Sequence, residues 1–253
     1  MRTSGTALVT GPTSGIGEAF ARLLAERGHD LVLVARDEVR LATLAGSLTS
    51  AHGVSVEVLP ADLSNREQLS IVEQRLLDRG QPIAVLVNNA GFGVKARFTR
   101  ADISDEQRML DVLVMAVMRL SHAAAVSMGE RGQGAIVNVS SVASWLTGST
   151  YSAAKAWVTV FSEGLAGEVA PLGVSVTAVC PGAVRTEFHE RAEMNMGSVP
   201  GWMWLDADRV ARKAMRDVDH GKVLSVTGGQ YKVMGALLRH SPRALVRRIG
   251  NAR

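Results

Sequence analysis

Thr10-Gly11-Pro12-Thr13-Ser14-Gly15-Ile16-Gly17 is the stretch on which the fold depends. It joins the apolar run 7–10 to a segment, 15–27, in which apolar residues repeat at helical spacing. Glycines let the main chain approach a bound pyrophosphate, and free N–H groups at the start of a helix stabilise its charge. A tight turn without a ligand is the alternative. The candidate phosphate contacts are Gly11, Thr13, Ser14, Gly15, Ile16 and Gly17.

Short β-branched or apolar runs alternate with longer stretches of helical period along the whole chain. This alternation is typical of βαβ units, in which helices cover both faces of a parallel sheet. Strands are expected at residues 7–10, 31–35, 54–59, 85–88, 135–140, 175–179 and 223–226. No repeat or linker divides the chain. The sequence therefore predicts one α/β domain, residues 1–253, with a doubly wound, Rossmann-type sheet of seven parallel strands.

The composition is typical of a globular protein, with 47% hydrophobic and 21% charged residues among 253. No uninterrupted apolar run reaches the roughly 18 residues of a membrane span. The first apolar run begins too near the N-terminus to leave room for a secretory signal. The single cysteine, Cys180, excludes an internal disulfide. We expect a soluble, cytoplasmic protein.

Positive charge is concentrated at the C-terminus. The formal net charge is +4, but residues 239–253 hold five arginines and no acid, which leaves −1 on the remainder. Nucleic-acid binding is not expected of such a body. Leu245 and Val246 beside Arg243 and Arg247 predict a short amphipathic helix that touches anionic lipid or docks on the protein or a neighbouring subunit. Docking is favoured because so short a helix is marginal alone.

The end of the second strand bears on which dinucleotide binds. In NAD-binding folds an acid about 20 residues past the last glycine binds the ribose 2′-hydroxyl. Arg36 stands there, 19 residues after Gly17, and its planar guanidinium fits the 2′-phosphate of NADP. Asp37 is interpreted as the cap of a helix that begins near Glu38. The sequence thus predicts NADP(H) in preference to NAD(H).

Tyr151 and Lys155 lie four residues apart in a predicted helix, so their side chains share one face. A free phenol titrates near pH 10, and an adjacent ammonium lowers that pKa by stabilising the phenolate. Ser140 or Ser141, after the fifth strand, supplies a hydroxyl for a substrate oxygen. The combination suits general acid–base chemistry, although Tyr–Lys pairs also occur by chance on exposed helices.

Five motifs in this order resemble the short-chain dehydrogenase/reductase family: TGPTSGIG at 10–17, NNAG at 88–91, SS at 140–141, YSAAK at 151–155 and PGAVRT at 181–186. The resemblance covers roughly residues 5–227. It implies hydride transfer between nicotinamide and a carbonyl or alcohol, in a homodimer or homotetramer.

The resemblance also implies roles for individual residues. Tyr151 is the acid or base, Lys155 lowers its pKa and holds the nicotinamide ribose, and Ser141 positions the substrate oxygen. Asp62 contacts adenine, and Thr186 meets the nicotinamide end. The other implied cofactor contacts are Leu63, Asn88, Asn89, Ala90, Gly91, Pro181, Gly182 and Val184, besides Tyr151 and Lys155.

Two features depart from the family pattern. Leu113 stands where the family often has an asparagine that holds a water in a proton relay, and leucine can neither donate nor accept a hydrogen bond. Ser141 and Tyr151 are ten residues apart, a few fewer than is common, so Ser140 remains an alternative. The alternative function is a dinucleotide-binding sensor or interaction protein that has lost turnover.

Residues 187–205 correspond to the family's substrate-covering segment. Their large apolar side chains are Phe188, Met194, Met196, Pro200, Trp202, Met203 and Trp204. They fit a lipophilic substrate, such as a 3-oxoacyl group or another apolar ketone, or they pack on the core or a partner subunit. Glu187, His189 and Glu190 are interpreted as solvated, so no metal is expected.

Overall fold

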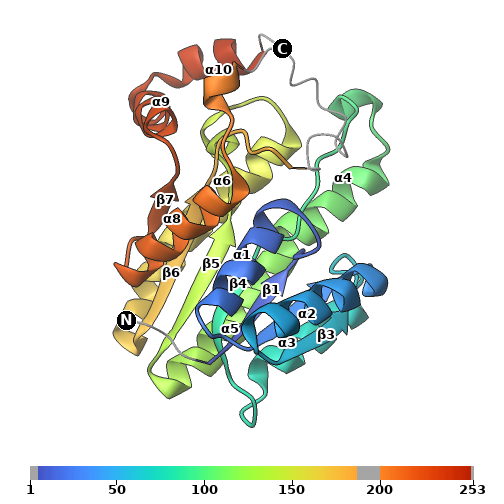
Figure 1. Cartoon of the computed structure of the whole chain (residues 1–253). Helices are drawn as coiled ribbons and strands as arrows, with labels where there is room; N and C mark the ends of the chain where they lie inside the picture. The colour runs from blue at the N-terminus through green and yellow to red at the C-terminus, as the bar shows by residue number, and fades with distance from the viewer. Residues whose placement is uncertain (1–4, 187–199, 252–253) are drawn as a thin grey trace.

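Seven parallel strands form one sheet in the order β3-β2-β1-β4-β5-β6-β7 (Figure 1). The computed structural model describes residues 5–186 and 200–251. The strands are β1 (Thr6–Thr10), β2 (Leu31–Ala35), β3 (Val56–Pro60), β4 (Ile83–Asn88), β5 (Gly134–Val139), β6 (Val174–Cys180) and β7 (Leu224–Val226). Every predicted strand is confirmed to within two residues at each end, and so is the doubly wound fold.

Helices cover both faces of the sheet. One face carries α1 (Gly15–Glu26), α2 (Glu38–His52) and α8 (Ala207–Asp219), and the other carries α3 (Arg66–Leu77), α5 (Val117–Arg131) and α6 (Thr150–Val169). Val9 of β1 packs in the core cluster of the first face with Phe20, whereas Leu8 packs in that of the second with Val72. Because both faces are buried, apolar residues run through the strands without alternation.

The other helical segments are shorter or lie toward the C-terminus. They are α4 (Ile103–Leu110), α9 (Gly229–His240), α10 (Arg243–Asn251), the π-helical η2 (Asp111–Ala116) and the 3₁₀ turns η1 (Phe98–Arg100), η3 (Val142–Trp145), η4 (Ala170–Leu172) and η5 (Gly201–Met203).

Side-chain caps fix where most of the long helices begin. The Asp37 carboxylate accepts a hydrogen bond from the Arg40 N–H (3.0 Å), which confirms the predicted cap of α2. Such an oxygen satisfies main-chain N–H groups that have no partner within the helix. The helices α3, α6 and α8 are capped in the same way by Asn65, Ser149 and Asp206. At α1, by contrast, the Ser14 side chain makes no cap.

One helical rod, Ile103–Arg131, consists of α4, η2 and α5 in succession. By length and composition it could cross a bilayer, but 56% of its most apolar window is buried inside the protein. The rod packs against α3, β4 and β5, so it is a core helix of the sheet's second face. Its π-helical turn holds one extra residue and carries Leu113.

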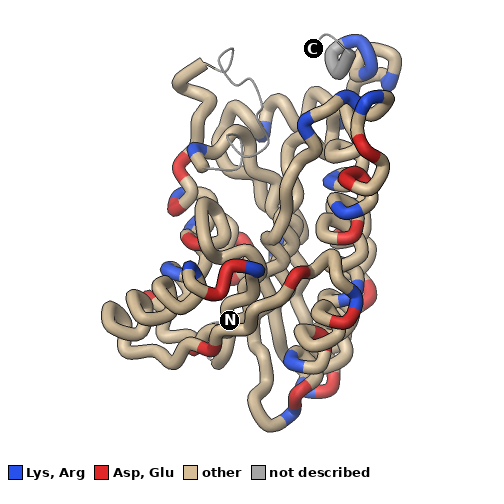
Figure 2. Tube along the Cα trace, turned by 90° about the vertical axis from the view of Figure 1, so that its right-hand side faces the viewer, with Lys and Arg blue, Asp and Glu red and all other residues tan. Residues whose placement is uncertain are grey.

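The two C-terminal helices pack on their own chain, where Figure 2 shows Lys and Arg residues gathered near the C-terminus. Val246 of α10 is fully buried, and the Thr147 hydroxyl donates to its carbonyl oxygen (3.4 Å). Arg239 of α9 pairs with Glu163 of α6 (3.3 Å). The basic tail therefore docks on the body, which is one of the arrangements that the sequence analysis favoured over lipid contact.

The strand order reverses direction between β1 and β4. In open parallel sheets, the loops at the carboxyl ends of strands diverge at such a reversal and leave a crevice for ligands. The segments that follow β1, β4, β5 and β6 all leave the sheet at this edge.

Candidate active site

The glycine-rich turn after β1 keeps its main chain open to a ligand. Gly11 and Gly15 have positive φ angles of 64° and 58°, which residues with a Cβ rarely adopt. A Cβ on Gly17 would overlap the carbonyl oxygen of Gly11, and one on Gly15 would lie 2.8 Å from Cγ2 of Thr186. Together with the uncapped start of α1, this cradle fits the pyrophosphate of a dinucleotide.

Asn89 holds the turn in place. Its side-chain amide donates to the carbonyl oxygens of Thr10 (3.0 Å) and Gly11 (2.9 Å). In return, the Thr10 hydroxyl oxygen accepts from the main-chain N–H groups of Asn89 (3.0 Å) and Ala90 (3.1 Å). These four bonds fix the ends of β1 and β4 beside each other.

Two residues that the family resemblance assigned to the cofactor turn their side chains into the core. The Asn88 amide donates to Asn138 Oδ1 (2.9 Å) and Ser121 Oγ (3.1 Å), inside a buried polar network. Leu63 is buried with Val72 in the core of the second face. Only their main chains can face a ligand at the carboxyl edge.

Arg36 and Asp62 follow β2 and β3, on one side of the glycine turn. Arg36 is exposed. Burial alone would raise the pKa of Asp62, but hydrogen bonds from the Ser64 hydroxyl and N–H, together with the charge of Arg36, lower it below its ordinary value. The two side chains therefore present an acceptor and a cation where the adenosine half of a dinucleotide would lie.

The segment after β6 is fixed by Tyr231 of α9, which the sequence analysis did not single out. The Tyr231 hydroxyl accepts from the Ala183 N–H (2.9 Å) and donates to the Met203 carbonyl oxygen (2.8 Å). Its ring fills the space where a Cβ on Gly182 would lie. No local pattern could have found this residue, because its partners are distant in the sequence.

The cofactor contacts implied for the segment after β6 lie between the glycine turn and η3. The Pro181 carbonyl oxygen accepts from the Val142 N–H (3.0 Å). Val184 is buried and forms a short parallel bridge with Leu205. Thr186 lies against Gly15.

Ser141, Tyr151 and Lys155 come together at the carboxyl end of β5. The Ser141 hydroxyl caps η3 by accepting from the Ala143 N–H (3.1 Å), and it is hydrogen-bonded to Tyr151. The Lys155 ammonium lies 5.8 Å from the centroid of the Tyr151 ring and donates to the Val139 carbonyl oxygen (2.7 Å). An ammonium has three N–H donors, so others remain for a ligand.

Ser140 faces the opposite way. Its hydroxyl donates to the Lys155 carbonyl oxygen (2.8 Å) and lies 2.7 Å from Thr159 Oγ1, in the protein interior. Of the two neighbouring serines, Ser141 is therefore the one whose hydroxyl lies beside Tyr151.

Burial is the largest influence on the pKa values of Tyr151 and Lys155. It lowers the pKa of the Lys155 ammonium to about 8. Tyr151 is partly exposed, yet loss of hydration around its phenol raises the pKa above the usual 10, despite the hydrogen bond with Ser141. This direction is opposite to the expected lowering by Lys155, because in the chain alone the loss of hydration is the larger effect. At neutral pH Tyr151 is a protonated phenol.

Leu113 packs against Tyr151 in a small apolar cluster with Met109 and Ala154. It is fully buried, and its Cδ2 lies 2.6 Å from the position that a Cβ on Gly91 would take. Hydrocarbon therefore fills this point of the helical rod, where the family often has an amide.

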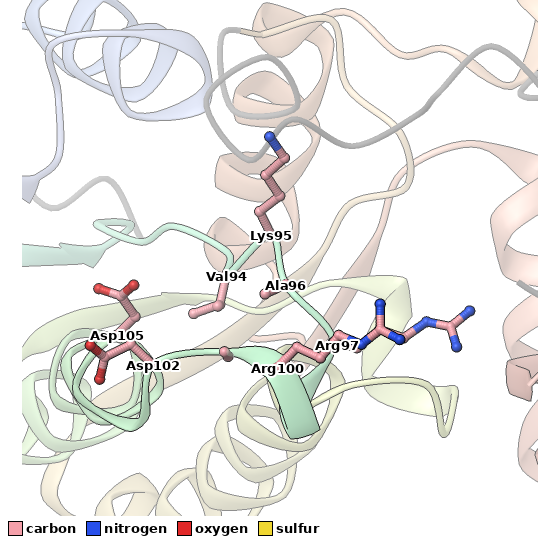
Figure 3. Close-up of a pocket in the computed structure, with 8 residues that line it drawn as sticks. Val94, Lys95, Ala96, Arg97, Arg100, Asp102 and Asp105 are labelled. Carbon is pink, nitrogen blue, oxygen red and sulfur yellow. The ribbon is translucent and has the colours of Figure 1, made fainter.

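A cavity of about 450 Å³ adjoins the site, along the connection from β4 to α4 (Figure 3). Its lining residues are Val94, Lys95, Ala96, Arg97, Arg100, Ala101, Asp102 and Asp105. Val94 also packs against the cluster of Met109, Leu113 and Ala154, as Tyr151 does, so the cavity and the phenol share this apolar neighbour. The sequence analysis did not predict this cavity.

The predicted substrate-covering segment is described only in part. Trp202 is 68% exposed, whereas Met203 packs against the core and Trp204 lies 6.0 Å from the Arg185 guanidinium. Within residues 5–186 and 200–251, no three His, Cys, Asp or Glu side chains gather as metal ligands. The residues of this segment outside the described range include Glu187, Phe188, His189, Glu190, Met194 and Met196.

The family profile described as short chain dehydrogenase matches residues 5–196. The chain belongs to this family. The resemblance seen in the five motifs is thereby confirmed, and the family consists of oxidoreductases that act on alcohol or carbonyl groups with NAD or NADP.

This short-chain dehydrogenase is 35% identical over 185 residues to ketoacyl reductase HetN of Nostoc sp., covering 72% of the chain and 64% of that relative. It is 36% identical over 189 residues to a very-long-chain 3-oxoacyl-CoA reductase of Anas platyrhynchos, covering 72% and 60%. The match thus spans less than two thirds of either relative. Among solved structures, a short-chain dehydrogenase from Sphingobium yanoikuyae in complex with NADPH is 35% identical with a TM-score of 0.87, covering 98% and 96% of the two chains.

Proposed function

We propose that this short-chain dehydrogenase is an NADPH-dependent reductase that converts the ketone of a 3-oxoacyl thioester, or of a comparable apolar substrate, to an alcohol. The observation that carries the proposal is the Ser141–Tyr151 hydrogen bond beside the buried ammonium of Lys155. The glycine cradle after β1 supports it, because its shape and open N–H groups suit a dinucleotide.

Tyr151 supplies the proton in this reaction. Its raised pKa keeps the phenol protonated at neutral pH, so it acts as the acid toward the ketone oxygen. NADPH, when bound, supplies the hydride to the ketone carbon. The Ser141 hydroxyl donates a second hydrogen bond to the same oxygen as negative charge develops there. The proton of Tyr151 then completes the alcohol.

Lys155 stabilises the site after the proton has left. Its ammonium, 5.8 Å from the ring centroid, favours the phenolate that remains on Tyr151. The Val139 carbonyl oxygen orients the amine, and a free N–H would hold a ribose hydroxyl of the cofactor. With a pKa of about 8, the amine is charged at neutral pH, when this support is needed.

Arg36 would select NADPH over NADH. Its guanidinium is exposed after β2, where a 2′-phosphate can pair with it. The neighbouring acid, Asp37, is engaged in capping α2 and is not available as a ribose ligand. The similarity to a protein whose solved structure holds NADPH points the same way.

The substrate class has two supports. Relatives of the chain are named ketoacyl and 3-oxoacyl-CoA reductases. In addition, the surroundings of Tyr151 are apolar, since Met109, Leu113 and Ala154 pack beside it and suit an acyl chain.

The test measures the reduction of acetoacetyl-CoA and of a panel of apolar ketones. The loss of NADPH absorbance reports the reaction. The wild-type chain is expected to consume NADPH, whereas Tyr151→Phe, which keeps the ring, loses about a hundredfold or more in kcat with unchanged NADPH affinity. Turnover retained in Tyr151→Phe would overturn the mechanism. NADPH binding without reduction of any ketone would identify a dinucleotide-binding sensor instead.

A further inference from the structure

Arg97 and Arg100 form a pair of cations on the rim of the cavity. Arg97 directly precedes the 3₁₀ turn η1 and Arg100 ends it, and the Arg100 N–H donates to the Arg97 carbonyl oxygen (2.7 Å). Figure 3 shows both guanidinium groups extending in the same direction, and Lys95 in another.

The two acids of the cavity are already engaged elsewhere. Asp102 caps α4 by accepting from the Ser104 N–H (2.9 Å), and Asp105 pairs with Arg108 (2.6 Å). Figure 3 shows both carboxylates on the side of the cavity away from the arginines. In the described part of the chain, Arg97 and Arg100 form no ion pair. Among residues 5–186 and 200–251, the two guanidinium groups therefore have no acidic partner.

A short stretch of chain leads from the reacting groups to this rim. Gly91 begins the connection, and a Cβ placed on it would lie 4.0 Å from Lys155 Nζ. Six residues later Arg97 stands on the rim, which is at most about 20 Å of extended chain. Between them Val94 lines the cavity and, like Tyr151, packs against the cluster of Met109, Leu113 and Ala154. A thioester with its ketone at Tyr151 can therefore extend its carrier arm along the cavity.

We propose that Arg97 and Arg100 bind the phosphate of a phosphopantetheine arm, so that the substrates are 3-oxoacyl thioesters of coenzyme A or of a carrier protein. The proposal rests on the proposed function for the location of the ketone. Two guanidinium groups side by side match phosphate oxygens, because each offers N–H donors in a planar fork. The apolar side chains of Val94 and Ala96 in the cavity lining suit the neutral part of the arm.

The deciding experiment compares one acyl group on two carriers. Acetoacetyl-CoA carries the phosphates, whereas S-acetoacetyl-N-acetylcysteamine ends before them. For the double variant Arg97→Gln/Arg100→Gln, KM for acetoacetyl-CoA is expected to rise about tenfold or more, while kcat and KM for the short thioester stay unchanged. Arg97→Lys/Arg100→Lys, which keeps both charges, should recover part of the loss.

Arg216→Gln is the matched control, since it removes one exposed arginine from α8, away from the cavity. It should alter neither KM. An equal rise for both thioesters would mean that the turn only supports the fold, and no rise for either would also overturn the proposal.

A binding measurement separates this proposal from the proposed function. Titration calorimetry with free coenzyme A and with 4′-phosphopantetheine needs no turnover, and the double variant should weaken both ligands about tenfold. If binding depends on the arginines but no thioester is reduced, the proposed phosphate site stands and the proposed reductase activity is wrong. If thioesters are reduced but binding does not depend on the arginines, the reductase activity stands and the phosphate site is wrong. Comparison of acetoacetyl-CoA with an acetoacetyl carrier protein then identifies the source of the arm.

Discussion

The ring of Tyr231 occupies the space beside Gly182 where any side chain at that position would begin. The same residue ties Ala183 to Met203 through its hydroxyl. One side chain of α9 thus fixes the segment that follows β6, next to the glycine turn.

Tyr231→Phe should weaken both the fold and cofactor binding. It keeps the ring against Gly182 but leaves the Ala183 N–H and the Met203 carbonyl without this partner, at a cost of about 1–3 kcal/mol. Urea unfolding and NADPH titration measure the two effects. Gly182→Ala, which forces the ring away, should cost more. An unfolding midpoint equal to that of the wild type would contradict this role.

Gly91 and Leu113 should show strong energetic coupling. Gly91→Ala places a Cβ 2.6 Å from Leu113 Cδ2 and is expected to destabilise the fold, and Leu113→Ala alone costs about 2–5 kcal/mol. In the double variant the new methyl group occupies the space that the leucine side chain has left. Its loss of unfolding free energy should therefore be smaller than the sum of the two single-variant losses by about 0.5–3 kcal/mol. Denaturant unfolding of the wild type, the two single variants and the double variant measures this coupling. Strictly additive losses would contradict a direct contact between Gly91 and Leu113.

The choice of cofactor should depend on Arg36. Arg36→Glu replaces the cation with an acid that repels a 2′-phosphate, so NADPH affinity should fall about ten- to a hundredfold. NADH lacks that phosphate and serves as the control within the same variant. Its affinity should stay constant or rise. Equal losses for the two cofactors would show that Arg36 acts on the fold and not on the phosphate.

The pH dependence should reflect the titration of Lys155. Burial lowers the pKa of this ammonium to about 8, so the amine is charged below that pH and neutral above it. The kcat/KM for NADPH, which reports groups of the free protein, should therefore fall as pH rises through about 8. Lys155→Arg stays charged throughout and should lose this fall, even at lower activity. A wild-type profile that stays flat across pH 8 would contradict the assignment.

Asp217 should set part of the stability at acid pH. Burial alone would raise the pKa of this carboxyl, but hydrogen bonds from Lys213, Lys222 and Ser225 lower it to about 2. A depressed carboxyl pKa stabilises the fold above the unfolded value near 4, by roughly 2 kcal/mol, and this is lost as pH falls from about 4 through 2. Asp217→Asn should remove that part of the acid-induced loss. Thermal unfolding across this pH range measures it, and parallel curves for the two proteins would count against it.

Short-range patterns in the sequence predicted the strands, the glycine turn and the Asp37 cap. Each of these depends on a few neighbouring residues: a β-branched run, a positive φ, or a carboxylate three residues before an N–H. The docking of the C-terminal helix through Val246 was also predictable, because a short amphipathic helix needs a surface to pack on.

Other features depend on contacts that no local pattern encodes. Tyr231 bonds to Ala183 across 48 residues, and the π-helical turn around Leu113 has the same apolar spacing as an ordinary helix over so few residues. The direction of the Tyr151 pKa shift reflects how much protein surrounds the phenol, which the Tyr–Lys spacing does not reveal.

The helical rod that begins with α4 contributes residues both to the cavity and to the surroundings of Tyr151. Asp105 in its first turn lines the cavity. Leu113 lies eight residues further along the rod, or about 12 Å, in the cluster against which Tyr151 packs. The lining of the cavity and the apolar surroundings of the phenol therefore depend on one continuous helix.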